Sequence, residues 1–148
     1  MLKLLCIGLL FSFAYGEEKE NYYVSASNYF NLDPWVLWAV GDTESKHNPY
    51  AINKNTNGTY DVGVMQINSI HFADLKRKYG IEPNDLYDPK ISIYVGASIL
   101  KECFQKHGNN WKAINCYNGL NYDNRVNNTY AKKVYKNYCL AKARYANK

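Results

Sequence analysis

The sequence predicts a single all-α domain, or a mainly α domain with at most a small β-hairpin. Three observations support this fold class. The 148 residues are enough for one hydrophobic core. Apolar residues recur at helical spacing in several segments, most clearly through residues 91–103. Almost no stretch shows the alternation of apolar and polar residues that is typical of a half-buried strand, so no larger sheet is expected.

The first helices are predicted from their boundaries. Residues 20–30 form a short amphipathic pattern, and Asp33 and Pro34 are a suitable N-cap and first-turn pair for a second helix that ends near Ser45. Residues 47–60 are polar and rich in Asn, Pro and Gly, so a loop with a small hairpin is expected there. Apolar residues then return to the core.

The later helices follow the same logic. A helix over 69–79 is stopped by Gly80, a short helical turn follows at 82–87, and Asp88 with Pro89 begins a long helix. The predicted helical segments are residues 20–30, 34–45, 69–79, 82–87, 89–103, 111–117 and 130–143.

The N-terminus has the pattern of a secretory signal peptide. A positive start at Lys3 precedes an apolar run over residues 4–13, and Ala14 and Gly16 place small residues at a cleavage site before Glu17. The run is too short to anchor the chain stably in a bilayer, although an uncleaved anchor is the alternative. We therefore expect a signal peptide at 1–16 and an exported domain at 17–148, with no membrane contact after cleavage.

Charge and composition narrow the range of partners. The formal net charge is +5, and it is +4 once Lys3 has been removed with the signal peptide. A mild positive charge suits an anionic polymer such as a bacterial cell wall. No basic cluster is interleaved with aromatic residues, so nucleic-acid binding is not expected.

Three cysteines remain after signal removal: Cys103, Cys116 and Cys139. Cys103 and Cys116 flank the turn at 108–110 and would face each other in an antiparallel helical hairpin, so this is the preferred disulfide, worth about 3 kcal/mol. Cys139 would then be unpaired. The alternatives are that Cys139 replaces either partner, or that the hairpin cysteines are simply buried. No C-x-x-C spacing supports a metal site.

Glu44 is the candidate catalytic residue. It closes an apolar stretch at residues 34–40, and burial of a carboxyl group there would raise its pKa and make it a general acid. A solvated residue at a helix end is the competing interpretation. Three further motifs follow it: Gly-Val-Met-Gln-Ile-Asn at 63–68, Cys-Tyr-Asn-Gly at 116–119, and Tyr130 with a nearby Lys-Val pair. They supply amides and hydroxyls that suit a sugar-binding cleft.

The order and spacing of these motifs resemble the soluble lytic murein transglycosylases of family 1 (the SLT domain), specifically the small secretion-associated type. The resemblance implies a goose-lysozyme-like fold and cleavage of the bond between N-acetylmuramic acid and N-acetylglucosamine. Glu44 would protonate the glycosidic oxygen and then, as a carboxylate, take a proton from the C6 hydroxyl, which closes a 1,6-anhydro ring without water. One carboxyl group suffices, and no cofactor or metal is expected.

The resemblance also implies which residues line the cleft. Tyr117 is expected to orient Glu44 or the substrate, Tyr130 to be structural or cleft-lining, and Met65 to form an apolar wall. Gln66 is expected to bind sugar, because a buried amide without a partner is costly. The predicted substrate-binding residues are Ser45, Asn53, Met65, Gln66, Asn68, Tyr117, Asn118 and Tyr130.

The chain departs from the family pattern in ways that leave rivals open. Gly119 follows Asn118 directly, and Val126 stands where an acid that can meet the stem peptide is common. Asp61 is a candidate second acid to which the resemblance gives no role. The alternatives are a goose-type lysozyme that delivers water and a peptidoglycan-binding scaffold with weak activity. We expect a monomer in the periplasm of a Gram-negative bacterium, opening the wall locally for a secretion, pilus or conjugation apparatus.

Overall fold

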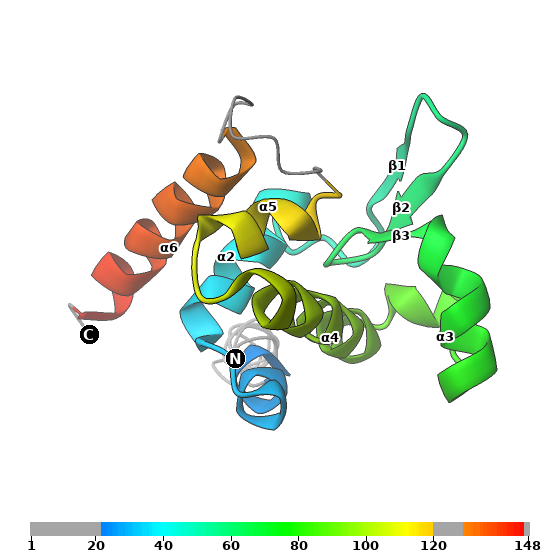
Figure 1. The fold of residues 1–148 in the computed structure, drawn as a ribbon, viewed down its shortest axis with the longest axis horizontal. Coiled ribbons are helices and arrows are strands. Elements are labelled where there is room, and N and C mark those ends of the chain that lie inside the picture. Colours follow the sequence, from blue (N-terminus) through cyan, green and yellow to red (C-terminus); the bar gives the residue numbers. More distant parts are fainter. Residues whose placement is uncertain (1–21, 120–128, 147–148) are drawn as a thin grey trace, which may run out of the picture.

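A computed structural model describes residues 22–119 and 129–146 of the chain (Figure 1). The predicted signal peptide and its cleavage site lie outside these residues. In the part of the chain that the structure describes, no helix has the length and apolar character needed to cross a membrane.

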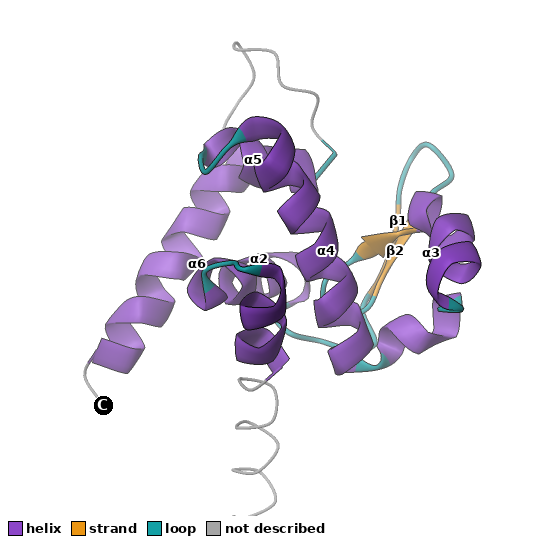
Figure 2. Cartoon of the chain, turned by 60° about the horizontal axis from the view of Figure 1, so that its bottom comes forward, coloured by secondary structure: helices purple, strands orange, loops and turns teal. Residues whose placement is uncertain are grey.

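The fold is mainly helical, as the sequence predicts (Figure 2). An initial helix covers residues 22–30. The labelled helices that follow are α2 (Pro34–Ser45), α3 (Phe72–Tyr79), α4 (Pro89–His107), α5 (Trp111–Tyr117) and α6 (Thr129–Ala146). Two 3₁₀ turns, η1 (Ser69–His71) and η2 (Pro83–Tyr87), precede α3 and α4. Compared with the predicted segments, α4 and α6 extend further at their C-terminal ends.

Local signals set the helix boundaries where the sequence places them. The Asp33 carboxylate accepts a hydrogen bond from the backbone N–H of Trp35 (2.8 Å), and Asp88 accepts one from Lys90 (2.8 Å). Each cap is followed by a proline that fits the first turn of its helix. Gly80 ends α3 in the left-handed conformation (φ 68°).

The polar region between α2 and α3 holds a three-stranded antiparallel sheet in the order β1-β2-β3. Its strands are β1 (Ile52–Lys54), β2 (Tyr60–Val62) and β3 (Ile67–Asn68). The expected hairpin is β1-β2, and the third strand was not predicted. Strands of two or three residues are too short to show alternation, and β1 is exposed throughout.

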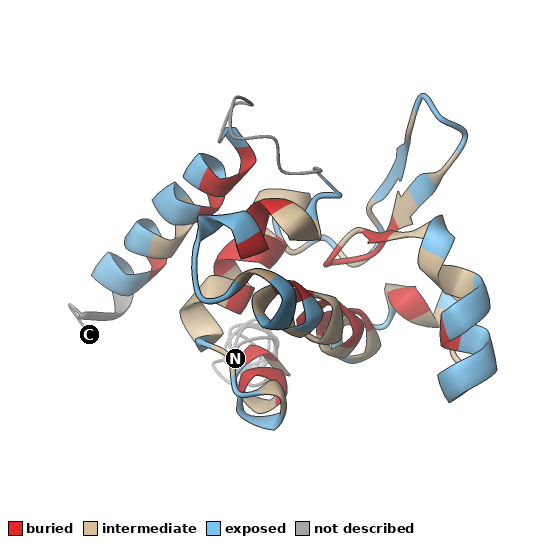
Figure 3. Ribbon diagram, viewed as in Figure 1, coloured by how far each residue is buried: buried red, intermediate tan, exposed pale blue. Residues whose placement is uncertain are grey.

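Helix α2 lies at the centre of the helical side of the molecule, between α6 and α4, while the sheet and α3 form the other side (Figure 1). Leu37, Ala39 and Val40 of α2 are fully buried. The inner face of α6 is buried and its outer face is exposed (Figure 3). The C-terminal end of α2 therefore points toward the junction between the helices and the sheet.

The segment that joins β2 to β3 packs closely against α4 and the turn before it. Gly63 has a left-handed backbone (φ 79°), and a Cβ atom there would overlap the carbonyl oxygen of Leu86. A Cβ atom on Gly96 of α4 would lie 2.7 Å from the side chain of Met65. The backbone N–H of Met65 also donates to the Ser92 hydroxyl (3.1 Å). The segment is thus fixed on α4.

A disulfide joins α4 to α5 through Cys103 and Cys116, with 5.8 Å between their Cα atoms. This is the preferred pairing from the sequence. Cys139 is free and exposed on α6, so it does not replace either partner. The bridge fixes α5, and with it Tyr117, against the long helix.

Candidate active site

Glu44 is the penultimate residue of α2, which ends where Lys46 adopts a left-handed conformation (φ 55°). The carboxyl group is partly buried, and its Oε1 accepts a 2.5 Å hydrogen bond from the hydroxyl of Tyr130. The two residues are 86 positions apart in the chain. The contact brings the end of α2 and the first turn of α6 together at one carboxyl group.

Burial raises the pKa of Glu44 from 4.5 to about 7. The hydrogen bond from Tyr130 acts in the opposite direction, because it stabilises the carboxylate, and the negative charge of Asp61 raises the pKa further. Near neutral pH the protonated and ionised forms of Glu44 are therefore both well populated. The solvated helix-end interpretation of this residue is wrong.

The hydrogen bond to Glu44 comes from Tyr130, whereas the hydroxyl of Tyr117, the residue expected to orient Glu44 or the substrate, bonds to the backbone. The Tyr117 hydroxyl donates to the carbonyl oxygen of Met65 (2.8 Å). Burial and the nearby Glu44 charge hold the pKa of each tyrosine well above its ordinary value. Both hydroxyls thus remain protonated donors, one fixing the carboxyl group and the other fixing the Met65 backbone.

Tyr130 is positioned by a buried amide that sequence reasoning missed. Asn115 of α5 is 3% exposed, and its Oδ1 accepts a hydrogen bond from the backbone N–H of Ala131 (3.2 Å). Further along α6, the Asn137 amide donates to the Thr43 hydroxyl on α2 (3.0 Å). The signal for Asn115 was available: an amide between apolar neighbours in a short helix needs a partner.

Ser45 and Gln66, two of the predicted cleft residues, use their polar groups within the chain. The Ser45 hydroxyl donates to the carbonyl of Val64 (2.7 Å), which ties the end of α2 to the segment before β3. Gln66 has a left-handed backbone (φ 49°), and its amide nitrogen donates to the carbonyls of Ala51 (3.1 Å) and Gly63 (2.9 Å). The expectation that this amide lacks a protein partner is therefore wrong.

The side chain of Met65 is fully buried against α4, so it does not form an open wall of the cleft. Met65 contributes to the site through its backbone, because its N–H donates to Ser92 and its carbonyl accepts from Tyr117. Two exposed residues, Asn53 on β1 and Asn118 at the end of α5, are the predicted cleft residues that remain open to solvent.

A second carboxylate, Asp61 on β2, is held by two amides. Its Oδ1 accepts from Asn68 (2.7 Å) and its Oδ2 from Asn55 (3.0 Å). Asn68 also caps the η1 turn through its Oδ1, which accepts from Ile70 (3.0 Å). Asp61 lies close enough to raise the pKa of Glu44. The resemblance gives Asp61 no role, but its position near Glu44 keeps it a candidate second acid.

Comparison of the chain with known protein families establishes the family to which it belongs. The transglycosylase SLT domain matches residues 21–139. The chain belongs to this family. Membership of the SLT family confirms the enzyme class that the sequence predicts, a lytic transglycosylase of peptidoglycan.

Curated relatives align with most of this chain. Invasion protein IagB of Salmonella typhimurium is 39% identical over 118 residues, which are 78% of this chain and 74% of that protein. The X polypeptide of Escherichia coli is 36% identical over 145 residues, covering 95% of this chain and 85% of that protein.

A solved structure confirms the lysozyme-like fold of this SLT domain. The lytic transglycosylase Slt of Pseudomonas aeruginosa superposes with a TM-score of 0.65 at 19% identity. The match covers 86% of this chain and 24% of Slt, so the chain spans about a quarter of that larger protein. At this identity the likeness shows the fold alone.

Proposed function

We propose that the protein cleaves the bond between N-acetylmuramic acid and N-acetylglucosamine without water, leaving 1,6-anhydro-muramic ends. Glu44 acts first as the acid and then as the base. The observation that carries this proposal is the pKa of about 7 for Glu44. A group with this pKa can give up a proton and take one back at neutral pH.

The two steps use one carboxyl group. Protonated Glu44 delivers its proton to the glycosidic oxygen, the bond breaks, and positive charge develops at the anomeric carbon of the muramic sugar. The carboxylate then removes the proton of the C6 hydroxyl, whose oxygen bonds to the anomeric carbon. Because Tyr130 holds Oε1, Oε2 is the oxygen left to face the substrate. In the related fold of Slt, a glutamate-to-glutamine mutant is described as inactive, which agrees with dependence on one glutamate.

The remaining predicted residues divide into two groups. Ser45, Gln66 and Asn68 shape the cleft through the hydrogen bonds described above, and Tyr117 fixes its floor by holding the backbone of Met65. Exposed Asn53 and Asn118 contact the sugars of the substrate, since amides can both donate to and accept from hydroxyl and acetamido groups.

The cellular role we propose is local opening of the wall for a secretion, pilus or conjugation apparatus. One relative, IagB of Salmonella typhimurium, is named an invasion protein, and this name fits such a role. The N-terminal pattern fits export to the periplasm after removal of residues 1–16, and the domain would act there as a monomer.

A hydrolase is the second candidate, and Asp61 is the observation that favours it. Enzymes that deliver water commonly use a second carboxylate to activate it or to stabilise the charged transition state. Asp61 is ordered by Asn55 and Asn68 and lies in the electrostatic field of Glu44. Both candidates share Glu44 as the acid, and they differ in the chemical end that each leaves on the glycan.

The deciding experiment is mass analysis of soluble fragments released from purified peptidoglycan. Glu44→Gln keeps the shape of the side chain but removes the acid, so we expect a loss of at least ~100-fold in rate. Glu102→Gln, an exposed position on α4, is the matched control and should retain the full rate. Fragments that end in 1,6-anhydro-muramic acid and depend on Glu44 would support the proposal.

Asp61→Asn separates the two candidates. Reducing ends in the wild type that disappear in Asp61→Asn would identify a hydrolase and overturn the transglycosylase proposal. Peptidoglycan that is bound but never cleaved, by wild type and Glu44→Gln alike, would instead identify a binding scaffold.

A further inference from the structure

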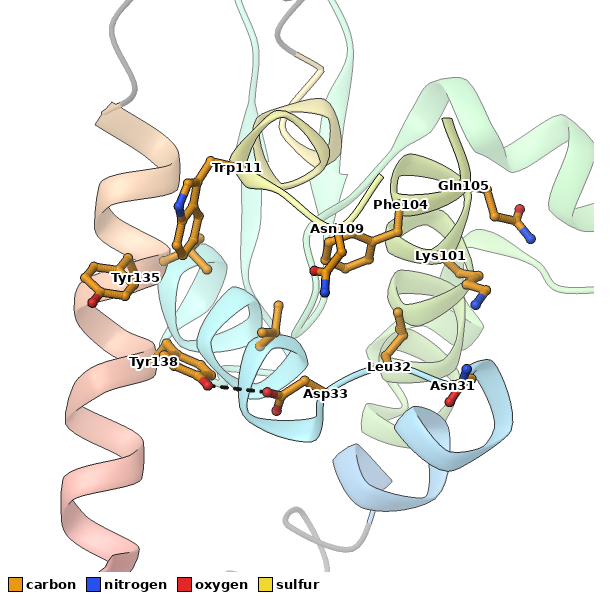
Figure 4. A pocket seen from close by; sticks show the side chains of 12 residues that line it. Asn31, Leu32, Asp33, Lys101, Phe104, Gln105, Asn109, Trp111, Tyr135 and Tyr138 are labelled. Carbon is orange, nitrogen blue, oxygen red and sulfur yellow. Dashed lines mark hydrogen bonds between the residues drawn. The ribbon is translucent and has the colours of Figure 1, made fainter. Parts of the chain in front are cut away.

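A pocket of about 500 Å³ lies at the opposite end of α2 from Glu44 (Figure 4). Residues at the start of α2 form its floor, and α4, α5 and α6 form its walls. Asp33 and Glu44 are at the two ends of α2, so the pocket and the carboxyl group are about 16 Å apart along the helix axis. The volume is in the usual range of ligand sites. None of the catalytic groups described above lines this pocket.

Aromatic rings dominate one side of the pocket. Trp111 and Tyr135 are 46% and 51% exposed, and their rings meet edge to face with centroids 5.2 Å apart. Tyr138 follows one turn later on α6 and stacks with Tyr135 at 6.5 Å. Across the pocket, Phe104 of α4 adds another ring. Pyranose rings pack their C–H faces on such surfaces, and exposed rings in a recess are typical of binding sites.

Lysines of α4 and α6 lie in or near this pocket. Lys101 of α4 lines the pocket, and the Lys142 ammonium lies 5.3 Å from the centre of the Tyr138 ring. Lys132 precedes Tyr135 by three residues, which places it on the same side of α6. Helix α6 contains no acidic residue. The site therefore combines flat apolar surfaces with positive charge, and it suits a sugar polymer that carries carboxylates.

One carboxylate, Asp33, also lines the pocket. Its Oδ1 accepts from the backbone N–H of Trp35 (2.8 Å), and its Oδ2 accepts from the hydroxyl of Tyr138 (3.4 Å). Asp33 is therefore committed to capping α2 and to holding Tyr138 in the pocket wall, and its charge is partly offset by these donors.

We propose that this pocket binds a second peptidoglycan segment, with sugar rings on Trp111 and Tyr135 and stem-peptide carboxylates paired with Lys101 and its neighbours. The proposal rests on the proposed function, because peptidoglycan is the anionic amino-sugar polymer that the catalytic site would cut. Two contacts on one polymer raise the local concentration of glycan at the cleft. The enzyme would thus stay on the wall between cleavage events.

The test is binding of the full chain to insoluble peptidoglycan, measured by co-sedimentation. All proteins carry Glu44→Gln so that the polymer is not consumed. The double variant Trp111→Ala/Tyr135→Ala should bind about tenfold more weakly. Lys101→Glu, which leaves the aromatic side intact, should also weaken binding and should make it less sensitive to salt. Tyr79→Ala, at a 69% exposed position on α3, is the matched control and should bind as the parent does.

The melting temperature of each variant is measured as well, to check that the variant is folded. The inference is overturned if both pocket variants bind peptidoglycan as tightly as Tyr79→Ala. It is also overturned if they lose binding to phosphatidylglycerol vesicles while peptidoglycan binding is unchanged, since the pocket would then recognise lipid headgroups. Failure of the proposed function would appear in the digestion assay, as fragments that are absent or that do not depend on Glu44. The binding assay is independent of that result, because every protein in it carries Glu44→Gln.

Discussion

At the scale of single residues, the pKa of Glu44 is set by burial and by two neighbours, Asp61 and Tyr130. Burial and Asp61 favour its protonated form, and the Tyr130 hydroxyl favours the ionised form. Because these influences partly offset one another, each can be tested by changing a single side chain. The two predictions at this scale test the pKa of Glu44 independently, one through protein stability and the other through the rate of cleavage.

Glu44→Gln should stabilise the protein at alkaline pH. The pKa of Glu44 is about 7 in the folded state against 4.5 ordinarily. Between these values the folded state keeps a proton that the unfolded chain releases, so the wild type loses stability as pH rises through this window. The variant should match the wild type near pH 4 and exceed it by up to about 3 kcal/mol near pH 8. Urea unfolding at both pH values measures this, and equal stability near pH 8 would contradict the burial of Glu44.

Tyr130→Phe should change the pH dependence of cleavage. Loss of the hydrogen bond removes the influence that lowers the pKa of Glu44, so the pKa should rise further. The alkaline limb of the rate profile should move to higher pH. The maximal rate should fall about tenfold, because Oε1 is no longer held. Initial rates of fragment release across pH measure both effects.

Tyr29→Phe, at a 76% exposed position, is the control for this profile and should leave it unchanged. An alkaline limb that stays in place in Tyr130→Phe would show that the tyrosine does not bond to the carboxyl group during turnover.

At the scale of elements, the critical joint is between α5 and α6. The Oδ1 atom of Asn115 accepts a hydrogen bond from the backbone N–H of Ala131 and so fixes the first turn of α6, which carries Tyr130. Asn115→Ala leaves this buried donor without its partner, which should cost about 1–3 kcal/mol of stability. The rate should also fall, because Tyr130 is the adjacent residue. Urea unfolding and kcat measure the two effects, with Asn84→Ala at an exposed site in η2 as control. Unchanged stability would contradict the role of Asn115.

The sequence predicts the boundaries of elements that carry local signals, but it does not predict most contacts between elements. Asp33 and Asp88 cap helices within their own neighbourhoods, and Gly80 ends one in the same way, so the sequence alone places these boundaries. Strand β3 has two residues and depends on pairing with β2, which no local pattern encodes. The helical hairpin did predict the disulfide, because Cys103 and Cys116 flank a short turn.

The candidate site shows the same division. Glu44 was identified from its place at the end of an apolar helix together with the three motifs that follow it in order, all of which can be read in the sequence. The resemblance favoured Tyr117 as its partner, but the bond comes from Tyr130, because it depends on how α6 lies across α2 and no local pattern encodes that packing. Gln66 was interpreted as a buried amide in need of a sugar partner, yet its amide donates to the carbonyl of Gly63 in its own loop and to that of Ala51, just before β1.

At the scale of the whole molecule, charge sets the response to salt. The chain has a net charge of +5, and helix α6 contributes lysines without any acid. Binding of Glu44→Gln to purified peptidoglycan should therefore weaken several-fold when salt rises from about 50 to 500 mM. Co-sedimentation across this range measures the effect, and uncharged chitin is the control polymer. Binding to peptidoglycan that ignores salt would show that contacts other than charge hold the protein on the wall.

The close packing of Gly96 against Met65 also has a consequence for the history of the sequence. A methyl group at position 96 would collide with the methionine side chain, and the backbone of position 65 is fixed on both sides by Ser92 and Tyr117. Neither position can change size alone without moving the Met65 backbone, which accepts the hydrogen bond from Tyr117. Among homologues, a larger residue at 96 should therefore occur together with a smaller one at 65, so that the two positions vary as a pair.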